Sequence, residues 1–190
     1  MRDNQSTKPI VAVVGDARLP PEDACLGLAR DCGRLLVDAG CRVLTGGLGG
    51  VMEAASQGAH LSSSYAPGAV LGVLPGHDPA DANEFVDIVL ATGLDVARNC
   101  VVANSDAVLA IGGGAGTLSE IAMAWQLHRL IVALRVPGWS GELADRRVDG
   151  RVRYPGIEED RVFGAADAAE AVSLVQKWLP RYTRRHRRVR

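Results

Sequence analysis

Short runs of apolar residues alternate along this chain with longer segments in which apolar residues recur every three or four positions. The short runs predict buried strands, and the periodic segments predict helices that cover a sheet. The expected strands are residues 9–14, 41–45, 69–74, 85–90, 107–111, 130–134 and 162–163, and the expected helices are residues 20–39, 51–59, 96–104, 117–128 and 165–179. The alternation predicts an α/β domain with a parallel sheet of about six or seven strands and helices on both faces.

The most informative stretch is a glycine-rich turn after the strand expected at residues 107–111. Glycine permits positive φ and close approach of a ligand, and the helix expected next offers unpaired N–H donors and a partial positive charge at its N-terminus. We therefore predict a phosphate-binding turn, with the site residues Gly112, Gly113, Gly114, Ala115, Gly116, Thr117 and Glu120. The alternative is a capping box, in which Thr117 and Glu120 only close the start of the helix.

A second glycine-rich turn follows the strand expected at residues 41–45. Its glycines are further candidates for ligand binding: Gly46, Gly47, Gly49 and Gly50. Open α/β sheets bind ligands at the carboxyl ends of their strands, so we expect both turns to line one crevice. The alternative is that this cluster only allows a helix and a strand to pack closely.

Several common ligand classes are disfavoured by the motifs that this chain lacks. The first expected strand is followed by Asp16-Ala-Arg18, without the G-x-G-x-x-G pattern of NAD-binding domains. The Walker pattern of ATP-hydrolysing proteins is also absent, and neither Lys8 nor Lys177 is placed to hold a γ-phosphate. The His, Cys, Asp and Glu residues do not show the spacing of a metal site. We therefore expect no NAD binding, no ATP hydrolysis and no metal site.

Charge is distributed unevenly, because residues 181–190 contain six arginines and no acid in a chain of net charge −1. We expect residues 9–180 to form one domain, with an irregular, charged excursion at 137–160, and residues 181–190 to form a mobile basic tail. Such a tail is more often solvated than bound to nucleic acid, so nucleic-acid binding is not expected. The chain lacks a secretory signal and an apolar run of roughly 18 residues, and its four cysteines show no CxxC spacing. The expected setting is therefore the cytoplasm, away from membranes.

Two charged residues are candidates for contact with the ligand. Arg98 is expected in the first turn of a helix, where the helix dipole disfavours a cation, so an anionic ligand nearby would compensate. Glu120 is the carboxylate beside the main glycine turn and is a candidate general acid or base, or an acceptor for a ligand hydroxyl. His77 and Asp78 follow the third expected strand, although a lone loop histidine is more often exposed than catalytic.

Several motifs resemble a known superfamily. The stretch Gly113-Gly-Ala-Gly-Thr-Leu-Ser-Glu120 resembles the G-G-x-G-T-x-x-E signature of the Lonely Guy and lysine-decarboxylase-like superfamily. The branch that includes molybdenum cofactor carrier proteins is similar to this chain at residues 45–55, 74–78, 82–83, 92–94 and 97–99. The resemblance covers about residues 9–140. It implies a Rossmann-like fold, a phosphorylated small molecule as the ligand and a homo-oligomer, either a dimer or a tetramer.

The resemblance implies two alternative functions. In the carrier branch, the protein would bind the molybdenum cofactor through its terminal phosphate. Lonely Guy enzymes release the base from nucleoside 5′-monophosphates with an arginine and the motif glutamate, which by position would be Arg98 and Glu120. This chain departs from the hydrolase pattern at Gly112, where the pattern has proline, and at Asn99, where it has lysine. The Arg98-Asn99 pair and the Ala82-Asn83 loop favour the carrier branch. The favoured interpretation is a molybdenum cofactor carrier, with a phosphoribohydrolase as the alternative.

Overall fold

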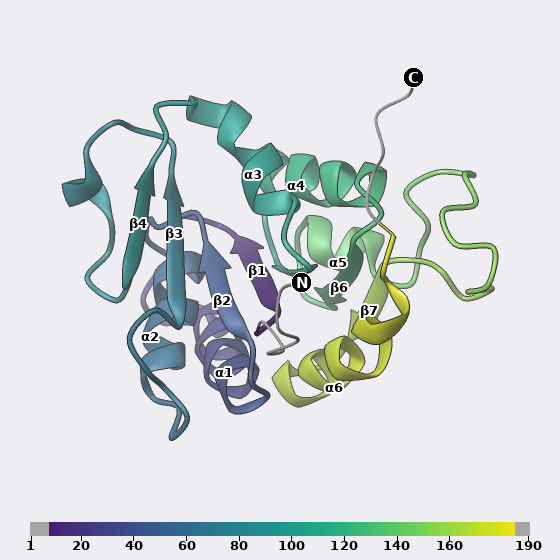
Figure 1. Ribbon diagram of the computed structural model, residues 1–190, viewed down its shortest axis with the longest axis horizontal. Coiled ribbons are helices and arrows are strands. Elements are labelled where there is room, and N and C mark those ends of the chain that lie inside the picture. The colour runs from purple at the N-terminus through teal and green to yellow at the C-terminus, as the bar shows by residue number, and fades with distance from the viewer. Residues whose placement is uncertain (1–7, 185–190) are drawn as a thin grey trace, which may run out of the picture.

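Seven parallel strands form one sheet in the computed structural model, which describes residues 8–184. The strands are β1 (Ile10–Gly15), β2 (Arg42–Thr45), β3 (Val70–Leu74), β4 (Ile88–Ala91), β5 (Ala107–Ile111), β6 (Leu130–Leu134) and β7 (Phe163–Ala165). Their order across the sheet is β4-β3-β2-β1-β5-β6-β7, and each neighbouring pair is parallel. Strands β5 and β6 are buried along their whole length, which explains their uninterrupted apolar sequences. The predicted Rossmann-like fold is confirmed (Figure 1).

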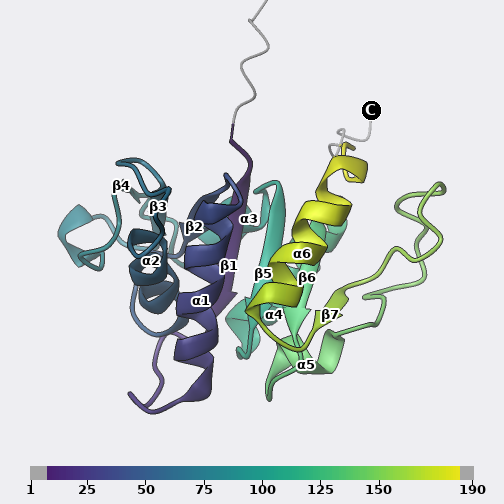
Figure 2. The ribbon, with the colours of Figure 1, turned by 90° about the horizontal axis from the view of Figure 1, so that it is seen from below.

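Helices cover both faces of the sheet. They are α1 (Ala24–Asp38), α2 (Val51–His60), α3 (Asn99–Ala103), α4 (Ala115–Gln126), α5 (Trp139–Leu143) and α6 (Ala168–Trp178), with the 3-10 turns η1 (Pro79–Asp81), η2 (Asp95–Arg98) and η3 (Leu179–Arg181). Helices α1, α2 and α6 lie on one face and α3, α4 and α5 on the other (Figures 1 and 2). Each face buries its own apolar layer, with Leu36 and Val172 in one and Ile121 and Trp125 in the other. No helix within residues 8–184 is long and apolar enough to cross a membrane.

Helices α1 and α2 approach each other through two glycines. A Cβ on Gly58 would lie 1.9 Å from the carbonyl oxygen of Arg30, and a Cβ on Gly33 would lie 1.9 Å from that of Ala55. The two helix backbones are therefore closer than any residue with a side chain would allow at these positions. This contact fixes α2, the helix that follows the second glycine turn.

The fourth strand begins later than predicted, at Ile88 rather than at residue 85. The backbone N–H groups of Phe85 and Val86 are bound to the side chain and the carbonyl of Asn83, respectively. Because a turn takes these donors, they cannot join the ladder with β3.

The excursion at 137–160 is more ordered than predicted, because it contains the short helix α5. The N–H groups of Trp139 and Ser140 donate to the carbonyls of Gly113 and Gly112, each at 3.0 Å. The start of α5 therefore supports the main glycine turn from behind, a contact between segments that local sequence patterns do not reveal.

The first part of the predicted basic tail is docked on the domain. Tyr182 is 2% exposed, and its hydroxyl donates to Asp160 Oδ1 at 2.7 Å. The same carboxylate pairs with the buried Arg153 at 2.5 Å. The prediction of a mobile tail is therefore wrong for residues 181–184, because Tyr182 supplies an apolar ring that packs and a hydroxyl that finds a buried acceptor. Residues 185–190 lie outside the described residues.

Candidate functional site

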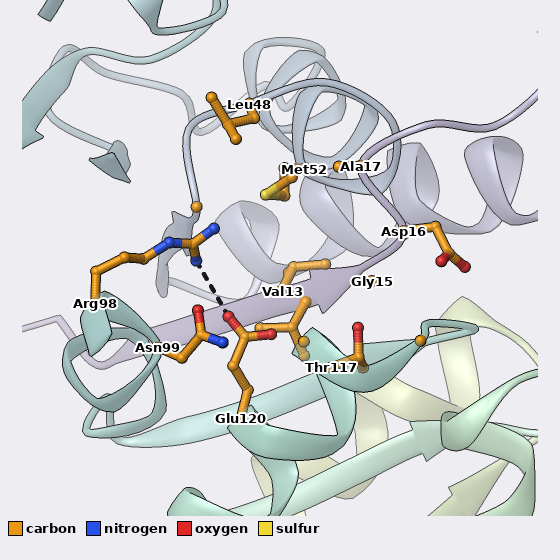
Figure 3. A pocket seen from close by; sticks show the side chains of 14 residues that line it. Val13, Gly15, Asp16, Ala17, Leu48, Met52, Arg98, Asn99, Thr117 and Glu120 are labelled. Carbon is orange, nitrogen blue, oxygen red and sulfur yellow. Dashed lines mark hydrogen bonds and ion pairs between the residues drawn. The ribbon is translucent and has the colours of Figure 1, made fainter. Parts of the chain in front are cut away.

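The carboxyl ends of β1, β2 and β5 border a pocket of about 270 Å³ near the centre of the sheet. Strand β1 lies between the other two, and the later strands extend outward from it on both sides. The pocket therefore lies where the strand order reverses, the usual ligand position in open α/β sheets. It is lined by Val13, Val14, Gly15, Asp16, Ala17, Gly46, Leu48, Met52, Arg98, Asn99, Gly114, Gly116, Thr117 and Glu120 (Figure 3).

The four glycines of the main turn have two different roles. Gly112 and Gly113 have φ values of 62° and 94°, a backbone conformation that favours glycine. Gly114 and Gly116 have no such requirement, and a Cβ on either residue would meet nothing within 4 Å. Both of these glycines line the pocket. Because these two residues have no side chain, the pocket stays open. Neither the backbone conformation nor the packing of the fold requires glycine at these two positions.

The main turn presents backbone donors to the pocket. Gly112 N–H donates to Ser140 Oγ and Gly113 N–H to Asp16 Oδ2, each at 2.8 Å, so these two donors are already used. Helix α4 begins at Ala115, and its N-cap residue Gly114 has no capping side chain. The N–H groups of the first turn of a helix have no intrahelical partner and carry partial positive charge. They are the natural site for an anion.

The capping-box alternative for this turn is wrong. Gly114 is the N-cap, so Thr117 lies inside the helix and does not close its start. The Glu120 carboxylate does not fold back onto the helix start but accepts a hydrogen bond from Arg98. Both side chains line the pocket instead.

The second glycine turn mainly shapes the wall of the pocket. Gly47 and Gly50 have positive φ values of 74° and 65°, and a Cβ on Gly50 would lie 2.2 Å from the carbonyl oxygen of Asp16. Of the four predicted glycines, only Gly46 lines the pocket, whereas Gly47, Gly49 and Gly50 do not. Gly112, Gly113 and Ala115 of the main turn are also not among the residues that line the pocket.

A loop from the far side of β3 supports the second turn. The Asn83 side-chain amide donates to the carbonyls of Gly47 and Leu48, at 3.1 and 2.9 Å. Asn83, which belongs to the resemblance at residues 82–83, therefore has a structural role.

Arg98 and Glu120 form an ion pair at one end of the pocket, with Nη1 and Oε1 3.2 Å apart (Figure 3). Their side chains are only 11% and 7% exposed. A Cβ on Gly46 would lie 2.5 Å from Arg98 Nη2, so the guanidinium lies directly against this glycine. Arg98 ends η2 and is the N-cap of α3, so it lies just before this helix and not in the first turn of a helix at 96–104. The negative charge beside it within the described structure comes from Glu120.

The environment of Glu120 favours its neutral form. Burial raises the pKa of its carboxyl from the ordinary value of 4.5 to about 7, and the Arg98 guanidinium, which lowers the pKa, offsets burial only in part. A carboxyl with this pKa is partly protonated near neutral pH. It can therefore give or accept a proton, and perturbed groups of this kind are common in functional sites.

We expect Glu120 to make the protein less stable as the pH rises from about 5 to 7. The pKa of Glu120 is higher in the folded state than in the unfolded chain. Its contribution to the free energy of unfolding is therefore fully present below the unfolded-state pKa and is lost as the pH rises through the folded-state pKa. The loss expected from Glu120 over this range is about 2 kcal/mol. Urea unfolding of the wild type and of Glu120→Gln at several pH values measures it. A difference in unfolding free energy that stays constant with pH would contradict the expectation.

Two polar residues of the pocket were not predicted as site residues. The Asp16 carboxylate accepts the N–H of Gly113 at 2.8 Å, and its main-chain carbonyl accepts the N–H of Val51 at 2.9 Å. Asn99 Nδ2 donates to Ser119 Oγ at 2.8 Å, and the Ser119 hydroxyl donates to the Gly116 carbonyl at 2.7 Å. A polar residue directly after the glycine that ends β1, at the carboxyl edge of the sheet, was the signal that could have identified Asp16.

His77 and Asp78 lie outside the pocket lining. The imidazole of His77 packs on Gly93, where a Cβ would lie 2.2 Å from Cε1. The Asp78 carboxylate caps η1 by accepting the Ala80 N–H at 2.8 Å. Within the part of the chain that the structure describes, no group of three or more His, Cys, Asp or Glu side chains is placed to hold a metal ion.

Two solved structures with similar folds come from proteins that are named for binding or carrying the molybdenum cofactor. The molybdenum cofactor binding protein from the phototrophic bacterium Rippkaea orientalis is 32% identical, with a TM-score of 0.73 over 90% of this chain and 98% of its own. The molybdenum cofactor carrier protein MCP from Chlamydomonas reinhardtii is 29% identical, with a TM-score of 0.72 over 92% and 99% of the two chains.

Sequence comparison gives a relative and a family. An uncharacterized protein from Archaeoglobus fulgidus is 39% identical over 111 residues, which are 58% of this chain and 70% of the relative. The model of the SLOG cluster4 family matches residues 8–160, most of the chain and all of the pocket. The chain therefore belongs to the SLOG cluster4 family.

Proposed function

We propose that this protein binds and carries the molybdenum cofactor, a phosphorylated pterin. The observation on which the proposal rests is the open start of α4, where Gly114 and Gly116 leave room that the fold does not require. The names of the two similar structures, a molybdenum cofactor binding protein and a carrier protein, support the choice of ligand. We also propose, from the resemblance, a cytoplasmic homo-oligomer.

The residues of the pocket suit the chemistry of this ligand. The N–H groups at the start of α4 would hold the terminal phosphate, as helix N-termini hold other phosphates. The guanidinium of Arg98 would contact the phosphate or another acidic group of the ligand, and the pterin edge, which carries N–H donors and a carbonyl acceptor, would lie against Glu120. Leu48 and Met52 supply an apolar wall for the face of the ring (Figure 3). The bound cofactor would supply the molybdenum chemistry of a recipient enzyme, and the carrier would shield it until transfer.

Arg98→Ala is expected to weaken cofactor binding by about 1.5–3 kcal/mol, roughly 10- to 150-fold, because a charge-assisted hydrogen bond is lost. Anaerobic isothermal titration with the cofactor measures the affinity. Arg34→Ala is the matched control, because Arg34 lies on α1 outside the pocket and its side chain is 40% exposed. Equal affinity of the Arg98 variant and the wild type would remove Arg98 from the binding site.

A second candidate function is hydrolysis of nucleoside 5′-monophosphates. The observation that favours it is Glu120, a buried carboxyl with a pKa raised to about 7 in the same pocket as an anion-binding turn. This pKa suits a general acid or base at neutral pH. Incubation of the protein with AMP distinguishes the two functions. A carrier releases no adenine, whereas a hydrolase releases adenine and loses that activity by orders of magnitude in Glu120→Ala. Adenine release of this kind would overturn the carrier proposal.

A further inference from the structure

Among the described residues, the lining of the pocket contains one cation and two acids. The cation is Arg98, and the acids are Asp16 and Glu120. In Figure 3, Asp16 lies at one end of the pocket and the ion pair at the other, so each acid occupies a different part of it. A phosphorylated ligand would therefore enter a pocket whose single guanidinium is already paired with a carboxylate.

The pairing leaves most of the Arg98 donors free to contact a ligand. Its one hydrogen bond within the described structure runs from Nη1 to Glu120 Oε1, and a guanidinium has five N–H donors in a planar fork. An anion bound to the remaining donors would share Arg98 with the Glu120 carboxylate. Two anionic groups would then meet one guanidinium at a place where both side chains are nearly buried. Charges of like sign that are close together in a poorly solvated place favour protonation of one of them.

Glu120 is the group that can relieve this conflict. Protonation removes its charge, releases Arg98 to the anion and gives the carboxyl an O–H that can donate to a ligand oxygen. Its pKa near 7 means that a proton is available at neutral pH at little energetic cost. A ligand that reached only the N-terminus of α4 would not require this change.

The charged groups around Glu120 identify Arg98 as its partner. Arg98 faces it from η2, and its guanidinium is the charge that acts on the Glu120 pKa. Asp16, after β1, is the other titratable group of the lining, and its carboxylate is engaged with the main turn. Strands β5 and β6, beneath α4, are apolar, and Glu142 of α5 is exposed.

We propose that binding of an anionic ligand in this pocket is coupled to protonation of Glu120 from solvent, so that the Arg98–Glu120 pair makes affinity depend on pH. This coupling rests on the proposed phosphate site. It applies to carrier and hydrolase alike, because it concerns binding and not turnover. A carrier with this property holds its ligand more tightly in acidic than in alkaline surroundings.

Ribose 5-phosphate is a suitable probe, because it has the phosphate and sugar but no base that hydrolysis could release. Isothermal titration at about pH 7.5, in buffers of different ionisation enthalpy, gives the number of protons taken up per ligand bound. The wild type should take up roughly half a proton more than Glu120→Gln. Between about pH 7 and pH 9, wild-type affinity should fall about tenfold relative to that of Glu120→Gln. The phosphate of the probe also titrates, but its effect is the same for both proteins and cancels in the comparison of the wild type with Glu120→Gln.

Glu53→Gln is the matched control, because Glu53 is exposed in the first turn of α2 and does not line the pocket. It should show the same proton uptake as the wild type. Binding with equal proton uptake in the wild type and Glu120→Gln would overturn the coupling and leave the phosphate site intact. If ribose 5-phosphate does not bind to the wild type at any pH, both the phosphate site and the coupling are wrong.

Discussion

Gly114→Val is expected to abolish ligand binding while leaving the protein folded. Gly114 has a φ of −96°, outside the left-handed region that favours glycine, and its Cβ would meet nothing within 4 Å. The branched side chain would instead occupy the space in front of the N-terminus of α4, where we place the phosphate. The loss of affinity should be at least about 100-fold, or about 3 kcal/mol. Titration with ribose 5-phosphate measures the loss, and the melting temperature should stay within about 4 °C of the wild type.

Gly150→Val is the matched control for this variant. A Cβ on Gly150 also meets nothing within 4 Å, but Gly150 lies in the excursion after α5, outside the pocket. This control should bind the probe with wild-type affinity. If Gly114→Val also binds normally, the main turn has a structural role only and the proposed phosphate site is wrong.

Gly58→Ala is expected to destabilise the protein by about 3 kcal/mol or more. Alanine normally stabilises a helix relative to glycine by about 1 kcal/mol. Here the new Cβ would lie 1.9 Å from the carbonyl oxygen of Arg30, so α1 and α2 would have to separate. Overpacking of this kind costs about 1–3 kcal/mol, and contact with a rigid backbone falls at the upper end or beyond. Urea denaturation gives the change in the free energy of unfolding.

Gly27→Ala, on the neighbouring helix α1, is expected to change the stability in the opposite direction. Gly27 is exposed, and a Cβ there meets nothing within 4 Å. This variant should therefore be more stable than the wild type by about 0.5–1 kcal/mol. If Gly58→Ala were as stable as Gly27→Ala, the close approach of α1 and α2 would be relaxed at little cost and would not determine the position of α2.

The sheet was predictable from the sequence because its central strands are buried on both faces and lie between glycine turns and helices. Strands β5 and β6 were predicted with the residues that form them. The edge strand β4 was placed less well, because its start depends on bonds to Asn83, which no periodic pattern reveals. Helix α5 was missed for a similar reason, since it is short and its start is held by the main turn.

The candidate site was only partly predictable, because many of its contacts join residues far apart in the sequence. Glycine spacing identified the main turn, but it did not distinguish Gly112, which the backbone requires, from Gly114, which opens the pocket. Arg98 was predicted to have an anionic ligand nearby, but helix periodicity could not show that Glu120 lies 3.2 Å away. Asp16 follows a strand whose neighbours in the sheet come from distant parts of the chain, so its contact with the main turn was not visible in the sequence.

Asp16 connects the starts of two helices across β1. Its main-chain carbonyl binds Val51, the first residue of α2, while its side chain binds Gly113, directly before the N-cap of α4. The two sides of the pocket are therefore held in one arrangement by a single residue directly after the central strand. A ligand that enters meets donors that are already preorganised, and little conformational entropy has to be lost on binding. The pocket should then behave as a rigid receptor that selects ligands by the fit of their shape, with fast association and without a closing motion of its walls.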